Sequence, residues 1–252
     1  MIRKIALLST LLTAFALHAQ IPWQVTERYL LPIFTPPVHG AFGSEFHTSL
    51  YVTNRANTPV TMVFANAGCI ICIQTPGMGA IAVPANGDLG PATFEYNGNP
   101  GRFVYVMTQA TSPLSMNLRV HDVTRDDRSF GVEIPVVSDS EFFAERIVLT
   151  GIPTDARFRN TLRIYSESAD TVTLTIQGRE PVLVPLTSNI GDPLDPKYAM
   201  YTDFPVDAGV IHITIDAPPL PPGPPLIPSP IWAFVTVTNN ETQVISTITP
   251  QP

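Results

Sequence analysis

The sequence contains two copies of one alternating pattern, and this internal repeat constrains the fold more than any other feature. Residues 158–176 align without a gap on residues 46–64. The aligned apolar side chains fall on every second residue, which is the period of a half-buried β-strand. The matched pairs are Phe158 with Phe46, Leu162 with Leu50, Ile164 with Val52, Val172 with Val60, Leu174 with Met62 and Ile176 with Phe64. We therefore interpret the chain as two copies of one β unit.

The first residues, 1–19, have the features of a secretory signal peptide. Arg3 and Lys4 precede an apolar run over residues 5–17, and Ala19 is a small residue of the kind that precedes a cleavage site. The run is well short of the roughly 20 apolar residues that a membrane-spanning helix needs. We expect cleavage before Gln20, with a second candidate site after Ala16, and a mature protein that is secreted or periplasmic without a membrane span.

The composition predicts an all-β protein. Val, Thr, Ile and Tyr dominate the periodic stretches, and clusters of Pro, Gly and Asn separate them at short spacing. No segment of helical period is longer than about two turns. Hydrophobic residues make up 44% of the chain, which is enough to form packed cores. The length after the signal peptide fits two domains, which we place at residues 20–138 and 139–252.

Each copy of the repeat is expected to form about seven short strands joined by turns, a pattern typical of immunoglobulin-like and fibronectin-III-like sandwiches. The chain resembles exported bacterial proteins with tandem domains of this kind. The resemblance covers the whole chain after the signal peptide as a pattern, without a signature residue. It implies two tandem antiparallel β-sandwiches, and a shared fold of this kind carries no function by itself.

Charge and motifs argue against several classes of function. The formal net charge is −7, and no basic run is present, which disfavours nucleic acid and anionic membranes as partners. The sequence lacks HExxH, GxSxG and a Gly-rich phosphate loop, and the histidines after the signal peptide are scattered over both copies. We expect a non-catalytic protein without a cofactor or a bound metal.

The only cysteines, Cys69 and Cys72, form a CxxC motif. In an exported protein a local disulfide that pins a turn is one interpretation. A thioredoxin-type redox pair is another, but that motif belongs at the start of a helix, and its surroundings here are all-β. A metal site would need further soft ligands nearby. Two acidic clusters, Asp122 with Asp126 and Asp127, and Asp192 with Asp195, lack the spacing of a calcium loop and are interpreted as solvated turns.

The two copies differ most in their last strand. Ile231, Ala233, Val235 and Val237 align on apolar residues of the first copy and predict a core face. The opposite face carries Ser115, Asn117 and Arg119 in the first copy but Trp232, Phe234 and Thr236 in the second. We expect His212 and Thr214 of a neighbouring strand on that same outer face. Outward aromatic side chains usually mark a contact surface, unless a loop or the first domain covers them.

The loop over residues 217–230 is the second difference between the copies. It is rich in Pro, includes Leu220 and Pro222, and favours an extended polyproline II conformation that either protrudes or covers the sheet. We therefore predict a contact region made of His212, Trp232, Phe234 and this loop, for a protein or glycan partner at the cell surface or outside the cell. The alternative is a carbohydrate-binding module or adhesin-like accessory protein in which Trp232 and Tyr165 stack on a sugar.

Overall fold

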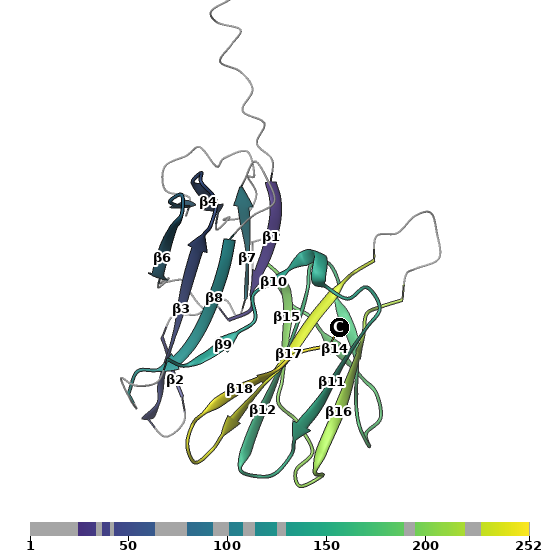
Figure 1. Ribbon diagram of the computed structural model, residues 1–252. Helices are drawn as coiled ribbons and strands as arrows, with labels where there is room; N and C mark the ends of the chain where they lie inside the picture. The colour runs from purple at the N-terminus through teal and green to yellow at the C-terminus, as the bar shows by residue number, and fades with distance from the viewer. Residues whose placement is uncertain are drawn as a thin grey trace, which may run out of the picture.

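The computed structural model describes residues 25–33, 37–40, 43–63, 80–92, 101–107, 114–124, 130–188, 195–219 and 228–251. Within these residues the regular structure is β-strand, apart from 3-10 conformation at Gly43 and in η4 (Asp139–Glu141), and every strand pairing is antiparallel (Figure 1). The predicted all-β class is therefore confirmed. The predicted signal peptide lies outside the described residues.

The strands up to Ser138, here called the first half, form two sheets. One sheet contains, in spatial order, β10 (Val137–Ser138), β1 (Val25–Leu31), β7 (Arg102–Met107), β4 (Val60–Val63) and β5 (Ala80–Val83). The other contains β2 (Val38–His39), β3 (Glu45–Asn54), β8 (Leu114–Asp122) and β9 (Val132–Ile134), with β6 (Gly87–Ala92) also paired to β3.

The strands from Asp139 onward, the second half, also form two sheets. One contains β11 (Arg146–Pro153), β16 (Val210–Asp216), β13 (Thr171–Ile176) and β14 (Val182–Pro185). The other contains β15 (Lys197–Tyr201), β12 (Phe158–Ser166), β17 (Ile231–Asn239) and β18 (Ile245–Ile248). Strand β12 pairs with β17 as β3 pairs with β8, and β16 lies between β11 and β13 as β7 lies between β1 and β4. The division into two sandwich domains related by a repeat stays a prediction.

Alternating side chains of the paired strands build the cores. Leu162 and Ile164 of β12 and Leu174 of β13 are fully buried, and Leu50 and Met62 are fully buried in the first half. Successive side chains of a strand point to opposite faces, so each strand buries one apolar row. The core of the second half consists of such rows from its own two sheets.

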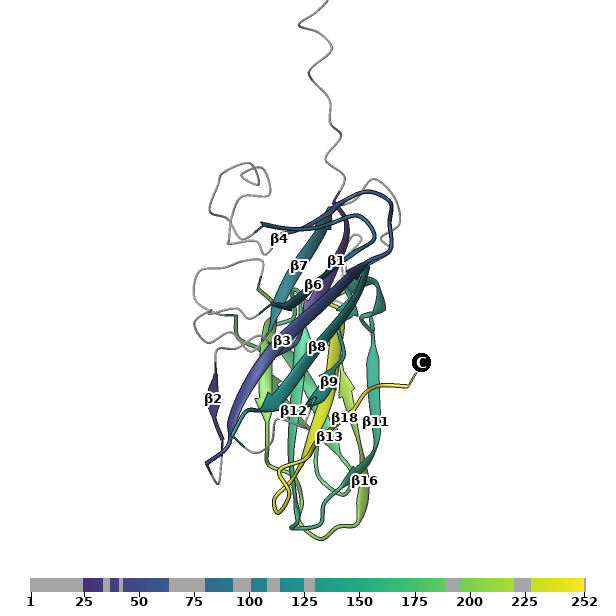
Figure 2. The same cartoon turned by 60° about the vertical axis from the view of Figure 1, so that its left-hand side comes forward.

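The core of the first half is different because it includes side chains from the second half. Tyr165 of β12 and Trp232 and Phe234 of β17 belong to the same buried cluster as Leu30 and Phe103 of the first half. The edge strands β9 and β18 also contact each other where the halves meet (Figures 1 and 2). The outer face of the sheet β15-β12-β17-β18 is therefore the surface that packs against the first half.

Candidate ligand-binding cleft between the two halves

The aromatic side chains predicted to form an exposed platform are buried. Trp232 and Phe234 lie on the face of β17 opposite to the core row, as the alternation predicted. However, Trp232 is 4% exposed and Phe234 is 0% exposed. Their ring centroids are 5.2 Å apart, and the stacked rings of Tyr165 and Phe234 have centroids 6.5 Å apart. From the sequence, either a loop or the first domain could cover these rings. The first half packs on them, so the expectation of an exposed platform was wrong.

His212 was placed on the wrong sheet by the sequence. Strand β16, which carries His212 and Thr214, pairs with β11 and β13, whereas β17 pairs with β12 and β18. The exposed His212 therefore lies on the other sheet of the second half, where its backbone N–H donates to Oε1 of Gln177 at 3.2 Å. Strand pairing depends on contacts that are distant in sequence, and the alternating pattern does not contain this information.

Tyr165, the other predicted sugar platform, is also a buried structural residue. Its hydroxyl donates a hydrogen bond to the backbone carbonyl of Pro32 in the first half. Burial raises the pKa of the Tyr165 phenol, so the group stays neutral and remains a donor. A fully buried ring that is hydrogen-bonded to the other half is not available for stacking on a sugar.

Several other predicted residues lie outside the described residues, namely Leu220, Pro222, Cys69, Cys72, Asp126, Asp127 and Asp192. Asp122 is described, and its Oδ1 accepts hydrogen bonds from the Glu45 backbone N–H at 3.1 Å and from the Thr124 hydroxyl at 2.8 Å. Asp122 thus lies at a turn, but Asp195, the described member of the second cluster, is 6% exposed, so the expectation of a solvated turn was wrong for that residue. Within the described part of the chain, no group of three or more His, Cys, Asp or Glu side chains is arranged to hold a metal ion.

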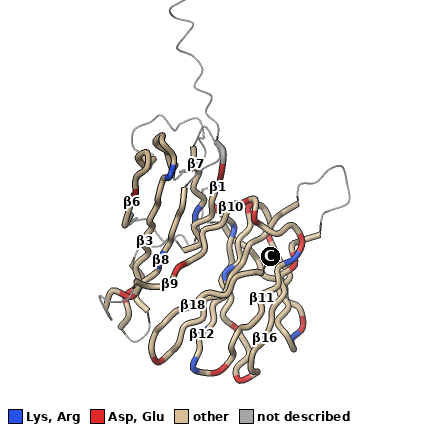
Figure 3. The backbone as a smooth tube through the Cα atoms, in the orientation of Figure 1, with Lys and Arg blue, Asp and Glu red and all other residues tan. Residues whose placement is uncertain are grey.

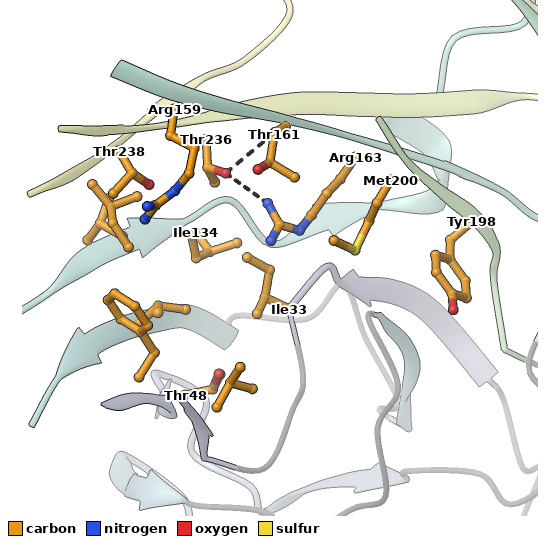
Figure 4. Close-up of a pocket in the computed structure, with 15 residues that line it drawn as sticks. Ile33, Thr48, Ile134, Arg159, Thr161, Arg163, Tyr198, Met200, Thr236 and Thr238 are labelled. Atoms are coloured by element: carbon orange, nitrogen blue, oxygen red, sulfur yellow. Dashed lines mark hydrogen bonds between the residues drawn. The ribbon is translucent and has the colours of Figure 1, made fainter. Parts of the chain in front are cut away.

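A cleft of about 490 Å³ opens beside the buried aromatic cluster, between the two halves (Figure 4). The first half contributes an apolar wall that includes Ile33, Phe46 and Ile134. The second half contributes alternate residues of β12 and β17 that follow the same outward rows as Tyr165 and Trp232. These outward residues are Arg159, Thr161, Arg163, Thr236 and Thr238, and Tyr198, Met200 and Ile245 complete this side.

The two arginines of the cleft are the residues that the sequence analysis missed. Figure 4 shows both side chains extending from β12 into the space between the halves. The alternating pattern did indicate the outward direction of the two arginine side chains, because residues 159, 161 and 163 face away from the core residues Leu162 and Ile164. Charged residues on an outward strand face are usually solvated, so the pattern alone does not single out these arginines. They become candidate ligand-binding residues because the first half packs beside them.

Arg163 is held in place by the strand next to it. Its Nη1 donates to Oγ1 of Thr236 at 2.8 Å, and its guanidinium carbon lies 5.9 Å from the centroid of the Phe234 ring. Burial lowers the pKa of Arg163, because a charged group loses hydration in such a site. Arg159 reaches Oε1 of Gln243 with Nη2 at 3.4 Å.

Neither arginine forms an ion pair with a carboxylate among the described residues, although five other Arg and Lys side chains of the described part do. The acidic residues of the second half lie mainly in turns and at strand ends (Figure 3). The described lining of the cleft contains no carboxylate, imidazole or thiol. The cleft therefore offers apolar surface, hydroxyl groups and two guanidinium groups.

Comparison of the chain with protein-family models, curated proteins and solved structures finds no match. Among the residues that the structure describes, none belongs to a helix long and apolar enough to cross a bilayer.

Proposed function

We propose that this is an exported, non-catalytic binding protein whose ligand occupies the cleft between the two halves. The observation that carries the proposal is the cleft itself, which has one apolar wall and one wall of arginines and threonines. Ligand sites in proteins are typically concave, mainly apolar, and supplied with a few polar groups that orient the ligand. Export is supported by the signal-peptide features of residues 1–19, and places the ligand at the cell surface or outside the cell.

The position of the cleft also supports this function. Binding sites often lie between domains, where two separately folded surfaces meet. The buried rings of Tyr165, Trp232 and Phe234 beside the cleft hold the two walls together, so the site is formed before a ligand arrives. A preformed site binds more tightly because less conformational freedom is lost on binding. Stacking of a sugar on Tyr165 and Trp232 would require exposed rings, and both rings are buried.

Filling the cleft tests the proposal. Thr161 is half-buried on the outward face of β12 and lines the cleft, so the larger side chain of Thr161→Phe should occupy part of the space. We expect the neutral apolar dye Nile red to bind the wild-type protein with increased fluorescence, and Thr161→Phe to weaken that binding about tenfold, since a misfit of this kind commonly costs 1–3 kcal/mol.

The control is Thr175→Phe, at a half-buried position of β13 in the sheet that does not line the cleft. This variant adds the same side chain and should bind the dye as the wild type does. The proposal fails if the wild-type protein does not bind the dye, or if both variants weaken binding equally.

A further inference from the structure

We infer, on the basis of the function proposed above, that the ligand of the cleft is an aliphatic carboxylic acid whose carboxylate binds Arg159 and Arg163. The charge in the cleft lies on one wall only. Both guanidinium groups come from β12, and the first-half wall opposite is made of Ile, Val and Phe side chains with one hydroxyl, Thr48. A molecule with one anionic end and one apolar end matches both walls.

The side chains of the cleft carry positive charge and no negative charge among the described residues. The guanidinium of Arg163 loses hydration on burial and is stabilised by a counter-charge, which the described residues that line the cleft do not supply, and the more exposed Arg159 adds a second positive charge to the same wall. The hydrogen bonds to Thr236 and Gln243 each use one donor of a guanidinium that carries five. Donors therefore remain for a ligand, and paired N–H groups of arginine fit the two oxygens of a carboxylate. The charge and the hydrogen-bond donors of the cleft are therefore complementary to an anion.

The apolar wall of the cleft favours a ligand whose remaining part is aliphatic. A peptide would bring backbone N–H and C=O groups against the wall of Ile33, Phe46 and Ile134, where these groups would lose their hydrogen bonds to water without replacement. A sugar would do the same with its hydroxyl groups. An aliphatic chain loses no hydrogen bond there and gains the hydrophobic contribution of burial. The volume of about 490 Å³ lies in the range typical of small-molecule sites.

Three probes with the same tail and different heads test the inference. Binding of dodecanoate, dodecanol and dodecyltrimethylammonium is measured by displacement of Nile red, with the two ionic probes below their micellar concentrations and dodecanol below its solubility limit. We expect dodecanoate to bind about tenfold or more tightly than dodecanol, because hydrogen bonds to a charged group contribute more than neutral ones. We expect the cationic probe to bind most weakly.

The arginines are tested by the double variant Arg159→Gln with Arg163→Gln, which should reduce the preference for dodecanoate over dodecanol to less than about threefold. The matched control is Arg146→Gln with Arg179→Gln. It removes the same charge at two residues that do not line the cleft and that pair with Asp216 and Asp203. This control should keep the full preference of the wild type, which separates a local contact from a general effect of net charge.

The outcomes separate the two proposals. If the wild-type protein does not bind Nile red, both the cleft function and the inferred ligand class are overturned, and if the dye binds but none of the three probes displaces it, only the inferred ligand class is overturned. If the three bind with equal affinity, or if the Gln variant keeps the preference for dodecanoate, the cleft remains a binding site but the inferred ligand class is wrong. A hexapeptide of Val and Leu with a free C-terminal carboxylate that binds more tightly than dodecanoate would assign the site to protein C-termini and overturn the aliphatic acid.

Discussion

At the scale of single residues, Tyr165 and Gly101 show how closely the two halves approach each other. The Tyr165 hydroxyl reaches the Pro32 carbonyl, and a Cβ atom at Gly101 would lie 2.6 Å from Cε1 of Tyr165 and 3.3 Å from the Pro32 oxygen. No side chain other than that of glycine fits at residue 101 without displacing the tyrosine. This small residue and this hydrogen bond define the position of the ring between the halves.

The variant Tyr165→Phe should lower the free energy of unfolding by about 1–3 kcal/mol, because the buried Pro32 carbonyl would lose its donor. Urea denaturation of the two proteins measures the difference. Tyr51→Phe is the control, since Tyr51 is 41% exposed on β3 and its change should stay within about 0.5 kcal/mol. An effect at Tyr165 no larger than the effect at Tyr51 would show that the hydrogen bond does not stabilise the contact.

At the scale of elements, β17 is buried on both of its faces. Ile231, Ala233 and Val235 pack in the core of the second half, and Trp232 and Phe234 pack in the core of the first half. An antiparallel strand with one solvated face normally alternates apolar and polar residues, whereas a strand covered on both sides is apolar on both. The aromatic residues that distinguish this strand from its first-copy counterpart therefore reflect its position between two cores.

Trp232→Ala should destabilise the protein by about 3–5 kcal/mol, the usual cost of removing a large aromatic ring from a core. The loss falls on the contact between the halves, so we also expect faster limited proteolysis near η4. Chemical denaturation and the time course of cleavage measure both effects. Phe130→Ala, at a ring that is 85% exposed, is the control and should change neither. Equal stability of Trp232→Ala and the wild type would contradict a shared core.

At the scale of the whole molecule, Arg28 of β1 in the first half forms ion pairs with two carboxylates of the second half. Its Nε donates to Oδ2 of Asp139 at 2.9 Å, and its Nη1 donates to Oε1 of Glu167 at 2.7 Å. Its guanidinium also lies 4.5 Å from the centroid of the Phe103 ring. Burial lowers the pKa of Arg28, but the hydrogen bonds to Glu167 and Tyr105 and the two carboxylates outweigh it and raise the pKa overall.

Lowering the pH should weaken the ion pair between Arg28 and Glu167. The hydrogen bond from Arg28 holds the pKa of Glu167 below its ordinary value of 4.5, against the opposing effect of burial. A carboxylate with a lowered pKa stabilises the folded state above its unfolded pKa, and that contribution is lost as the pH falls through the folded pKa. The stability difference between the wild type and Glu167→Gln should therefore be largest at neutral pH and should shrink below about pH 4.5.

Denaturation of both proteins over a series of pH values measures this difference. Glu180→Gln, at an exposed carboxylate, controls for the loss of one negative charge. A difference between the wild type and Glu167→Gln that stays constant or grows as the pH falls would contradict a stabilising ion pair at this position.

The sequence predicted which face of its strand a side chain occupies more accurately than it predicted which strands pair with each other. The faces of β12 and β17 follow from alternation along each strand, which is a local property of the backbone. Strand β17 pairs with β12 over residues 158–166, a contact that is distant in sequence, and with β18 on its other side. Because a period of two residues is common to every strand in either sheet, His212 was grouped with Trp232 although the two lie on different sheets.

By itself, the sequence determined the all-β class, the core rows of β12, β13 and β17, and the presence of an unusual outward row on β17. Only the tertiary structure decided what covers that row. The rings of Tyr165, Trp232 and Phe234 complete the core of the first half, and Arg159 and Arg163 of the same sheet line a cleft. The physical reason is that alternation along a strand shows which side chains share a face. Whether that face is buried depends on which distant part of the chain packs against it.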